Sequence, residues 1–159
     1  MSIAVQGRKS NENCCYFYSK HHHNTEKLLK AIKVNSKDDI TLIDVTEVAS
    51  ASLEDYDAVG FASGIYYSKF EKRVLEFAKN YLPSGKNVFF IYTSGSKNKD
   101  YSKSIREAIQ DKNANILGEY GCRGYDTYGP FRLIGGISKN HPNEEEINGA
   151  VDFYNSLNQ

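Results

Sequence analysis

The sequence predicts an α/β fold: a doubly wound five-stranded parallel sheet of order 2-1-3-4-5, with helices on both faces. Short apolar segments alternate along the chain with segments that have the periodicity of amphipathic helices. The short segments are continuously apolar, which is typical of parallel strands that are covered on both faces. The chain has 159 residues, a length that fits one such domain.

The individual elements follow from these two patterns. The expected strands are residues 14–19, 39–45, 57–63, 86–94 and 113–122. The expected helices are residues 24–33, 69–82, 100–112 and 143–157. In the second helix Phe70, Val74 and Phe77 recur at intervals of three and four residues, so they are expected on one face against the sheet. Residues 1–13 are predicted to form a polar N-terminal arm ahead of a domain of residues 14–159.

Composition restricts the class of protein. Lys plus Arg and Asp plus Glu number 20 each, so the formal net charge is zero, which disfavours nucleic acid as a partner. No apolar segment approaches the roughly 20 residues that a membrane span needs, and the first residues lack the apolar stretch of a secretory signal. Cys14, Cys15 and Cys122 give no CxxC pair and no disulfide framework, so we expect a cytoplasmic protein with no membrane partner. Cys14 and Cys15 should point to opposite faces of their strand, into the core.

The predicted strand order also predicts where a ligand binds. In such a sheet, ligands bind beyond the carboxyl ends of the strands, at the switch point beside the first strand. Four loops meet there: residues 19–25, 63–68, 93–99 and 122–142. Any binding site should therefore be built from these loops.

The first loop reads SKHHHNT and runs directly into a helix. Asn24 or Thr25 can cap that helix, and the free N–H groups at its start can also bind an anion; the loop alone leaves both interpretations open. A metal site at His21, His22 and His23 is disfavoured, because adjacent residues of an extended segment point in opposite directions. No Cys or carboxylate stands nearby at the usual ligand spacing.

At this loop the sequence resembles a known family. YFYSKHHHNTEKLLKAI is similar to the first strand, phosphate loop and first helix of flavodoxins and flavodoxin-like proteins, whose loop reads roughly S/T-x-T/H-G-N-T. Asn24 and Thr25 match its closing Asn-Thr, and His22 lies where a Thr or His donor is usual. His23 stands in place of the usual Gly, a departure from the pattern. FASGIYYSKFEK, YTSGS and GCRGYDTYGPFRLIGGISKNHP resemble later loops of the family, so the resemblance covers residues 14–157.

The resemblance implies a non-covalently bound flavin mononucleotide (FMN). Its phosphate would bind loop 19–25, with His22 as the main histidine donor. Either Tyr66 or Tyr67 would stack on the flavin, the other being a core tyrosine, and a peptide of the Ser63–Ile65 stretch would turn its carbonyl toward the flavin. Loop 93–98 would bind the pyrimidine edge, or else be an ordinary tight turn. The cofactor-binding candidates are Ser19, Lys20, His21, His22, His23, Asn24, Thr25, Ser63, Gly64, Ile65, Tyr66, Tyr67, Thr93, Ser94, Gly95, Ser96, Cys122, Arg123 and Gly124. Among them Cys122 is also expected to be a buried structural thiol, and no catalytic residue is predicted.

The function implied is that of an electron carrier between redox partner proteins, as a monomer or weak dimer. Carriers of this family are typically strongly acidic, so the zero net charge keeps open an NAD(P)H-dependent flavoprotein reductase of quinones or other small acceptors. His23 keeps open a flavodoxin-like partner-binding module that has lost FMN. A receiver domain is excluded, because it needs an acidic pair where this chain has Tyr18 and Ser19.

Overall fold

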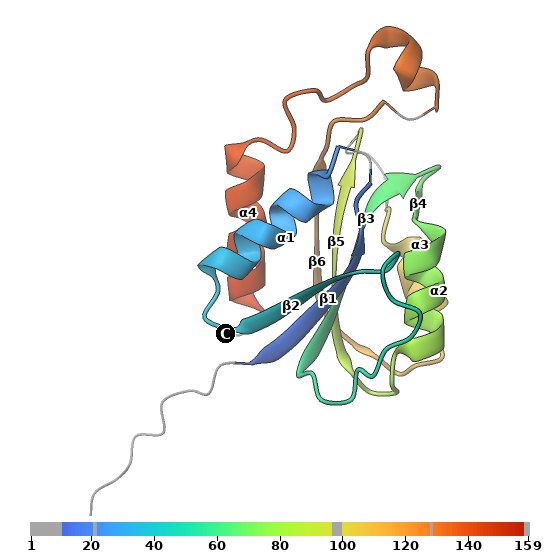
Figure 1. The fold of residues 1–159 in the computed structure, drawn as a ribbon, viewed down its shortest axis with the longest axis vertical. Coiled ribbons are helices and arrows are strands. Elements are labelled where there is room, and N and C mark those ends of the chain that lie inside the picture. Colours follow the sequence, from blue (N-terminus) through green and yellow to red (C-terminus); the bar gives the residue numbers. More distant parts are fainter. Residues whose placement is uncertain (1–10, 21, 97–99, 128, 158–159) are drawn as a thin grey trace, which may run out of the picture.

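The computed structural model describes residues 11–20, 22–96, 100–127 and 129–157 (Figure 1). Five parallel strands form the sheet in the order β2-β1-β3-β5-β6. Their bounds are β1 Glu12–Tyr18, β2 Asp39–Asp44, β3 Ala58–Tyr66, β5 Asn87–Ser94 and β6 Asn115–Arg123. Counted among these five strands alone, this is the predicted order 2-1-3-4-5, which is confirmed.

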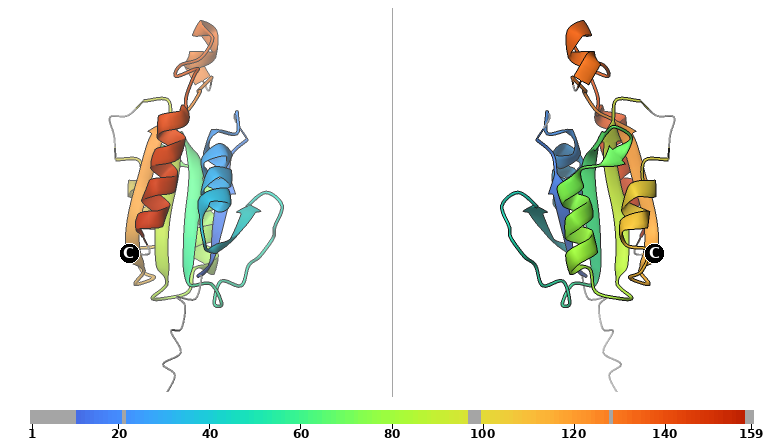
Figure 2. Two further views of the ribbon diagram at one scale, coloured as in Figure 1. Left: turned by 90° about the vertical axis from the view of Figure 1, so that its left-hand side faces the viewer. Right: turned by 90° about the vertical axis from the view of Figure 1, so that its right-hand side faces the viewer.

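Helices cover both faces of the sheet, as predicted. Figures 1 and 2 show α1 (Asn24–Asn35) with α4 (Glu144–Ser156) on one face, and α2 (Lys72–Tyr81) with α3 (Lys103–Ala108) on the other. Successive side chains of a strand point to opposite faces, so the side chains of β1 pack alternately into two hydrophobic cores. Cys14 packs in the core under α2 and α3, and Cys15 packs in the core under α1 and α4. Both thiols are buried, as expected.

The end of β3 differs from the predicted loop at 63–68. β3 continues to Tyr66 and then pairs antiparallel with a short strand, β4 (Lys69–Phe70), through Ile65↔Phe70 and Tyr66↔Lys69. The two linking residues, Tyr67 and Ser68, have φ values of 48° and 67°, the left-handed conformation of a type I′ hairpin turn. The predicted helix 69–82 therefore begins only at Lys72, where the Glu71 carboxylate accepts from the Arg73 N–H.

A long loop connects β6 to α4. We call its residues 124–142 the β6–α4 segment. Residue 128 lies outside the described residues. An antiparallel bridge closes its base, with Asp126 N–H donating to Ile137 O at 2.9 Å and Ile137 N–H to Asp126 O at 2.8 Å. A 3-10 helix, η1 (Gly129–Ile134), forms its outer end. In Figure 1 this orange end stands beyond the carboxyl edge of the sheet.

Candidate functional site

A hollow lies where β1, β3, β5 and β6 end, at the predicted switch point; we call it the strand-end hollow. Its lining residues are Ser19, Asn24, Thr25, Gly64, Ile65, Tyr66, Thr93, Ser94, Gly95, Gly124, Tyr125 and Asp126. All four predicted loops contribute, because the carboxyl ends of parallel strands share one edge of the sheet.

The first turn of α1 enters this hollow. Ser19 is buried and its Oγ accepts the Glu26 N–H at 3.1 Å, so the end of β1 supplies the bond that caps the helix. The N-cap residue is His23, and its side chain makes no capping bond. Capping by Asn24 or Thr25 is therefore wrong: both are already helical and both line the hollow. The N–H groups of a first helical turn have no intrahelical partner, so those of Asn24 and Thr25 are suited to an anion.

Thr25 joins this turn to β5. Its Oγ1 lies 2.9 Å from Thr93 Oγ1, and both residues are buried. One hydroxyl hydrogen occupies the space between the two oxygens, so the pair still has one O–H group that can donate elsewhere. This pair lines the hollow beside the helix end.

Asn24 is buried, and its two polar atoms have different surroundings. Nδ2 donates to Tyr125 O at 2.8 Å, while Oδ1 is the one buried side-chain polar atom among the described residues that has no hydrogen-bond partner. Gly124 makes this contact possible, because a Cβ there would lie 2.7 Å from Asn24 Nδ2. A buried acceptor without a partner costs about 1–3 kcal/mol, so Oδ1 is a position that a ligand donor would satisfy.

The described histidines of the first loop take the left-handed conformation, His22 with φ 56° and His23 with φ 53°. The position that is usually Gly thus keeps a backbone that suits Gly. The His22 ring lies 4.1 Å from the Tyr125 ring, and its Nε2 is 2.9 Å from Thr127 Oγ1, so it contacts the β6–α4 segment and is not among the hollow's lining residues. His23 Nδ1 pairs with Glu26 Oε2 at 2.8 Å on the surface. His21 lies outside the described residues.

Lys20 is not among the residues that line the strand-end hollow. Its Nζ lies 2.6 Å from Asp44 Oδ2 at the end of β2. Partial burial raises the pKa of the Asp44 carboxyl, but the bonds from Lys20 and Thr46 outweigh it and hold that pKa below its usual value. The ammonium of Lys20 is thus engaged in an ion pair outside the hollow.

At the end of β3, Gly64, Ile65 and Tyr66 line the hollow and Ser63 does not. The buried Ser63 Oγ donates to Gly64 O and accepts the Glu71 N–H at 2.9 Å, so it fixes the path of the chain into α2. Tyr66 is half-buried, with its ring edge-on to Tyr18 at 6.0 Å. Tyr67 is 78% exposed, so the expectation that one tyrosine of the pair is a core residue is wrong.

At the end of β5, Thr93, Ser94 and Gly95 line the hollow. Ser94 Oγ donates to Ser96 O at 2.6 Å, and Ser96 Oγ lies 3.1 Å from Tyr101 OH, so both hydroxyls have partners in the chain that follows β5. Ser96 is not a lining residue, and residues 97–99 lie outside the described residues.

Comparison with known proteins agrees with this geometry. Residues 16–131 match the flavodoxin domain family. The chain belongs to this family. It is 40% identical over 143 residues to an uncharacterized protein of Methanocaldococcus jannaschii, covering 89% of this chain and 94% of that protein.

Two solved structures share the fold of this flavodoxin-family chain. A flavodoxin from the domain Archaea matches with a TM-score of 0.62 and 15% identity, covering 92% of this chain and 99% of that one. A flavodoxin variant of Fusobacterium nucleatum bound to flavin mononucleotide matches with a TM-score of 0.65 and 12% identity, covering 94% and 96%.

Only some of the predicted residues at the end of β6 line the strand-end hollow of this flavodoxin-family chain. Gly124 lines the strand-end hollow, but Cys122 and Arg123 do not. Cys122 is buried in the core under α1 and α4. Tyr125 and Asp126 line the hollow and were not predicted. They lie three and four residues after the fifth predicted strand, in the predicted loop 122–142, and that position was the available signal.

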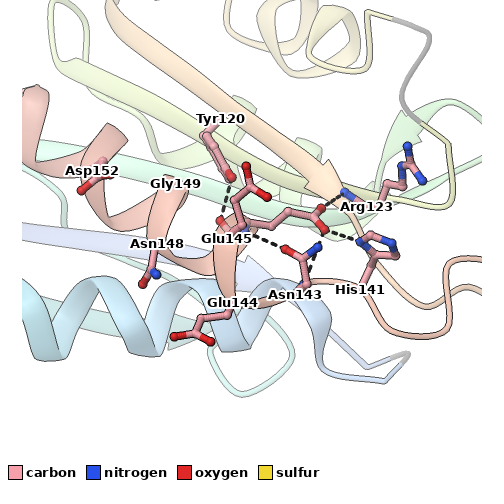
Figure 3. A pocket seen from close by; sticks show the side chains of 10 residues that line it. Tyr120, Arg123, His141, Asn143, Glu144, Glu145, Asn148, Gly149 and Asp152 are labelled. Carbon is pink, nitrogen blue, oxygen red and sulfur yellow. Dashed lines mark hydrogen bonds and ion pairs between the residues drawn. The ribbon is translucent and has the colours of Figure 1, made fainter.

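A second hollow lies between β6 and the start of α4, lined by Tyr120, Arg123, His141, Asn143, Glu144, Glu145, Glu146, Asn148, Gly149 and Asp152 (Figure 3). Glu146 makes several polar contacts in this hollow. It contacts His141 Nδ1, accepts the Arg123 N–H at 2.9 Å, and forms a capping box with Asn143. Burial raises the pKa of the Glu146 carboxyl, but these bonds outweigh burial and lower it. The bonds of Glu146 therefore anchor the start of α4.

Among the described residues, no group of three or more His, Cys, Asp or Glu side chains is arranged to hold a metal ion. Within the same residues, no helix has both the length and the apolar character needed to cross a membrane.

Proposed function

We propose that this chain binds FMN non-covalently and carries electrons between redox partner proteins. The observation that carries the proposal is the buried first turn of α1, which presents Asn24 and Thr25 to the strand-end hollow at the switch point of the sheet. Membership of the flavodoxin family and the likeness to an FMN-bound flavodoxin support the same cofactor.

The residues fit a phosphate group without a cation. The positive end of the α1 dipole and the N–H groups of its first turn favour a dianion. Ser19 Oγ already accepts the Glu26 N–H, so its own hydrogen is free to donate, and the Thr25–Thr93 pair has one further O–H donor. Lys20 is not required, since it pairs with Asp44.

The residues also fit the remainder of the cofactor. Asn24 Oδ1 is a buried acceptor that needs a donor, and the sugar-alcohol chain of FMN has hydroxyl groups that can donate. Gly64 leaves room beside Tyr66, because the nearest contact of a Cβ there would be Tyr66 OH at 3.4 Å, and Tyr66 offers an aromatic ring at the hollow. FMN supplies the one- and two-electron chemistry when bound, while the protein binds, orients and shields it.

Titration of the purified chain with FMN and with riboflavin, followed by flavin fluorescence, tests the cofactor. Riboflavin has the same ring and sugar-alcohol chain but no phosphate for the N–H and hydroxyl donors of the α1 turn. FMN should therefore bind at least about a hundredfold more tightly, the equivalent of about two hydrogen bonds to a charged group. Equal affinities would show that the turn is not a phosphate site.

Anaerobic reduction of the FMN-loaded chain tests the carrier role. A carrier should be reduced by a reduced redox protein and only slowly by NADPH. Rapid, saturable reduction by NADPH would favour the reductase alternative. A chain that binds neither flavin would favour the partner-binding module.

A further inference from the structure

Most of the highly exposed apolar side chains lie in two segments at the carboxyl edge of the sheet, the edge that holds the strand-end hollow. Among the described residues, the large apolar side chains with more than half of their surface exposed are Leu133 at 89%, Val34 at 81%, Tyr67 at 78% and Ile134 at 72%. Val34 belongs to the end of α1, at the opposite edge of the sheet. The other three lie in the β3–β4 turn and in η1, both at the carboxyl edge in Figures 1 and 2. Single exposed apolar residues scattered over a surface are normal, whereas several at the same edge indicate a contact surface.

The exposed end of the β6–α4 segment is held in a defined place. Besides the Asp126↔Ile137 bridge at its base, Ser138 Oγ donates to Gly95 O at 2.9 Å. Ile137 packs on Gly95, where a Cβ would lie 2.5 Å from Ile137 Cδ1. The base is therefore fastened to the β5 loop that lines the hollow, and η1 projects Leu133 and Ile134 from this base.

The β3–β4 turn presents Tyr67 in a conformation that does not favour it. A type I′ turn prefers Asn-Gly, because both central residues have positive φ. Tyr67 occupies such a position with its side chain mostly in solvent, so its aromatic ring gains little burial within the chain. An aromatic side chain exposed in this way is typical of a binding surface.

The two segments that carry these exposed apolar residues, residues 64–70 and 127–140, contain basic residues and no acidic ones. Residues 127–140 contain Arg132 and Lys139 and no Asp or Glu, and residues 64–70 contain Lys69 and no Asp or Glu. Lys69, Arg132 and Lys139 are exposed, and the ion pairs among the described residues involve none of them. Carboxylates flank both segments, Glu71 after the β3–β4 turn and Asp126 before residue 127, and the chain as a whole has zero formal net charge. The positive excess is therefore local to these two segments.

We propose that the β3–β4 turn and η1 together form a docking surface for an acidic redox protein. This inference rests on the proposed electron-carrier function and names the chemistry of its partner. Tyr67, Leu133 and Ile134 supply the apolar contact, while Lys69 and Arg132 steer the partner by charge. Complementary charge of this kind raises association rates and weakens with salt.

The test measures binding of the full chain to a small [4Fe–4S] ferredoxin of strongly negative net charge, with basic cytochrome c as the opposite probe. Ionic strength is raised from about 20 mM to about 300 mM, which shortens the screening length severalfold. Binding is measured with and without FMN. The ferredoxin should bind, and its affinity should fall with salt; cytochrome c should bind more weakly at low salt.

Two variants have matched controls at the far end of α1. Arg132→Glu is compared with Lys33→Glu, which makes the same change in net charge, and Leu133→Ser is compared with Val34→Ser. At low salt Arg132→Glu should lower ferredoxin affinity by about fivefold or more and act mainly on the association rate. Leu133→Ser should act mainly on dissociation. The two controls should leave both rates unchanged.

Three results would overturn the inference: ferredoxin binding that is absent or insensitive to salt, equal effects of the η1 variants and their controls, or preferential binding of cytochrome c. Binding to phosphatidylglycerol vesicles but not to ferredoxin would assign the surface to a membrane instead. Self-association lost in Leu133→Ser, without ferredoxin binding, would assign it to a second copy. Failure of FMN to bind would refute the proposed function, while ferredoxin binding by the FMN-free chain would still report on the docking surface.

Discussion

His22 Nε2 lies 2.9 Å from Thr127 Oγ1, across a sequence separation of 105 residues. This contact, with the His22 ring against Tyr125, joins the first loop to the β6–α4 segment at the rim of the strand-end hollow. We expect it to hold the segment over a bound cofactor. Thr127→Val should raise the FMN dissociation rate about threefold to tenfold, as for one hydrogen bond.

The control is Thr127→Ser, which keeps the hydroxyl and should dissociate like the parent chain. His22→Ala should have a similar effect to Thr127→Val, and the double variant should add little, because both remove one contact. Stopped-flow displacement of FMN measures these rates. Unchanged rates in both single variants would show that the contact does not retain the cofactor.

Thr25→Ala should weaken FMN binding by about 1.5–3 kcal/mol, the range for a hydrogen bond to a charged group, or roughly tenfold to a hundredfold in Kd. Thr25→Ser keeps the hydroxyl and should keep most of the affinity. Because Thr25 and Thr93 share one hydrogen bond, Thr93→Val should weaken binding too, and less than additively with Thr25→Ala. Titration at fixed salt measures all four constants. An unchanged Kd for Thr25→Ala would make this threonine purely structural.

His23→Gly should stabilise the fold by about 1 kcal/mol, since His23 has φ 53° and Gly adopts that region without steric cost. The lost His23–Glu26 contact is exposed and contributes little. His23→Ala keeps a Cβ at the same φ and should give no comparable gain. Urea unfolding measures stability, and FMN affinity should be preserved or improved. Equal stability of the Gly and Ala variants would argue against backbone strain at this position.

Gly124→Ala should lower FMN affinity about tenfold or more, because its Cβ would displace Asn24, and overpacking of this kind typically costs about 1–3 kcal/mol. Gly64→Ala is the graded control, since the nearest contact of its Cβ is Tyr66 OH at 3.4 Å. Its effect should be smaller. Equal losses in the two variants would mean that the position of Asn24 does not matter for binding.

Glu146→Gln should destabilise the fold at pH 7 by about 1–2 kcal/mol, because the carboxylate accepts several hydrogen bonds at the start of α4. Its pKa is lower in the folded chain than the ordinary 4.5, so the stabilisation is present above about pH 4.5 and is lost as pH falls through the folded pKa. The difference between parent and variant should thus shrink in acid. Glu144→Gln, in the same turn but exposed, is the control. A difference independent of pH would contradict this account.

Much of the fold and part of the site could be predicted from local sequence signals. Continuous apolar segments and helical periodicity depend only on neighbouring residues, and they predicted the five parallel strands, their order and the edge where the loops meet. His23 has the left-handed conformation at the position where the family's loop pattern has Gly, a residue that favours this conformation. Ser19, Asn24, Thr25, Gly64, Ile65, Tyr66, Thr93, Ser94, Gly95 and Gly124 were predicted, and all line one hollow.

The β3–β4 hairpin is local, but its pairing of Ile65 with Phe70 falls partly in a stretch whose apolar spacing predicted a helix. Other features depend on residues far apart in the chain, so only the tertiary structure decided them. Lys20 pairs with Asp44 because β1 and β2 are neighbours, and Asn24 bonds to Tyr125 O because β6 brings Gly124 against α1. The sequence by itself determined the sheet, the edge and the chemistry of the first loop. Which side chains enter the hollow was decided by packing, because a side chain's direction depends on the partners that the fold brings to it.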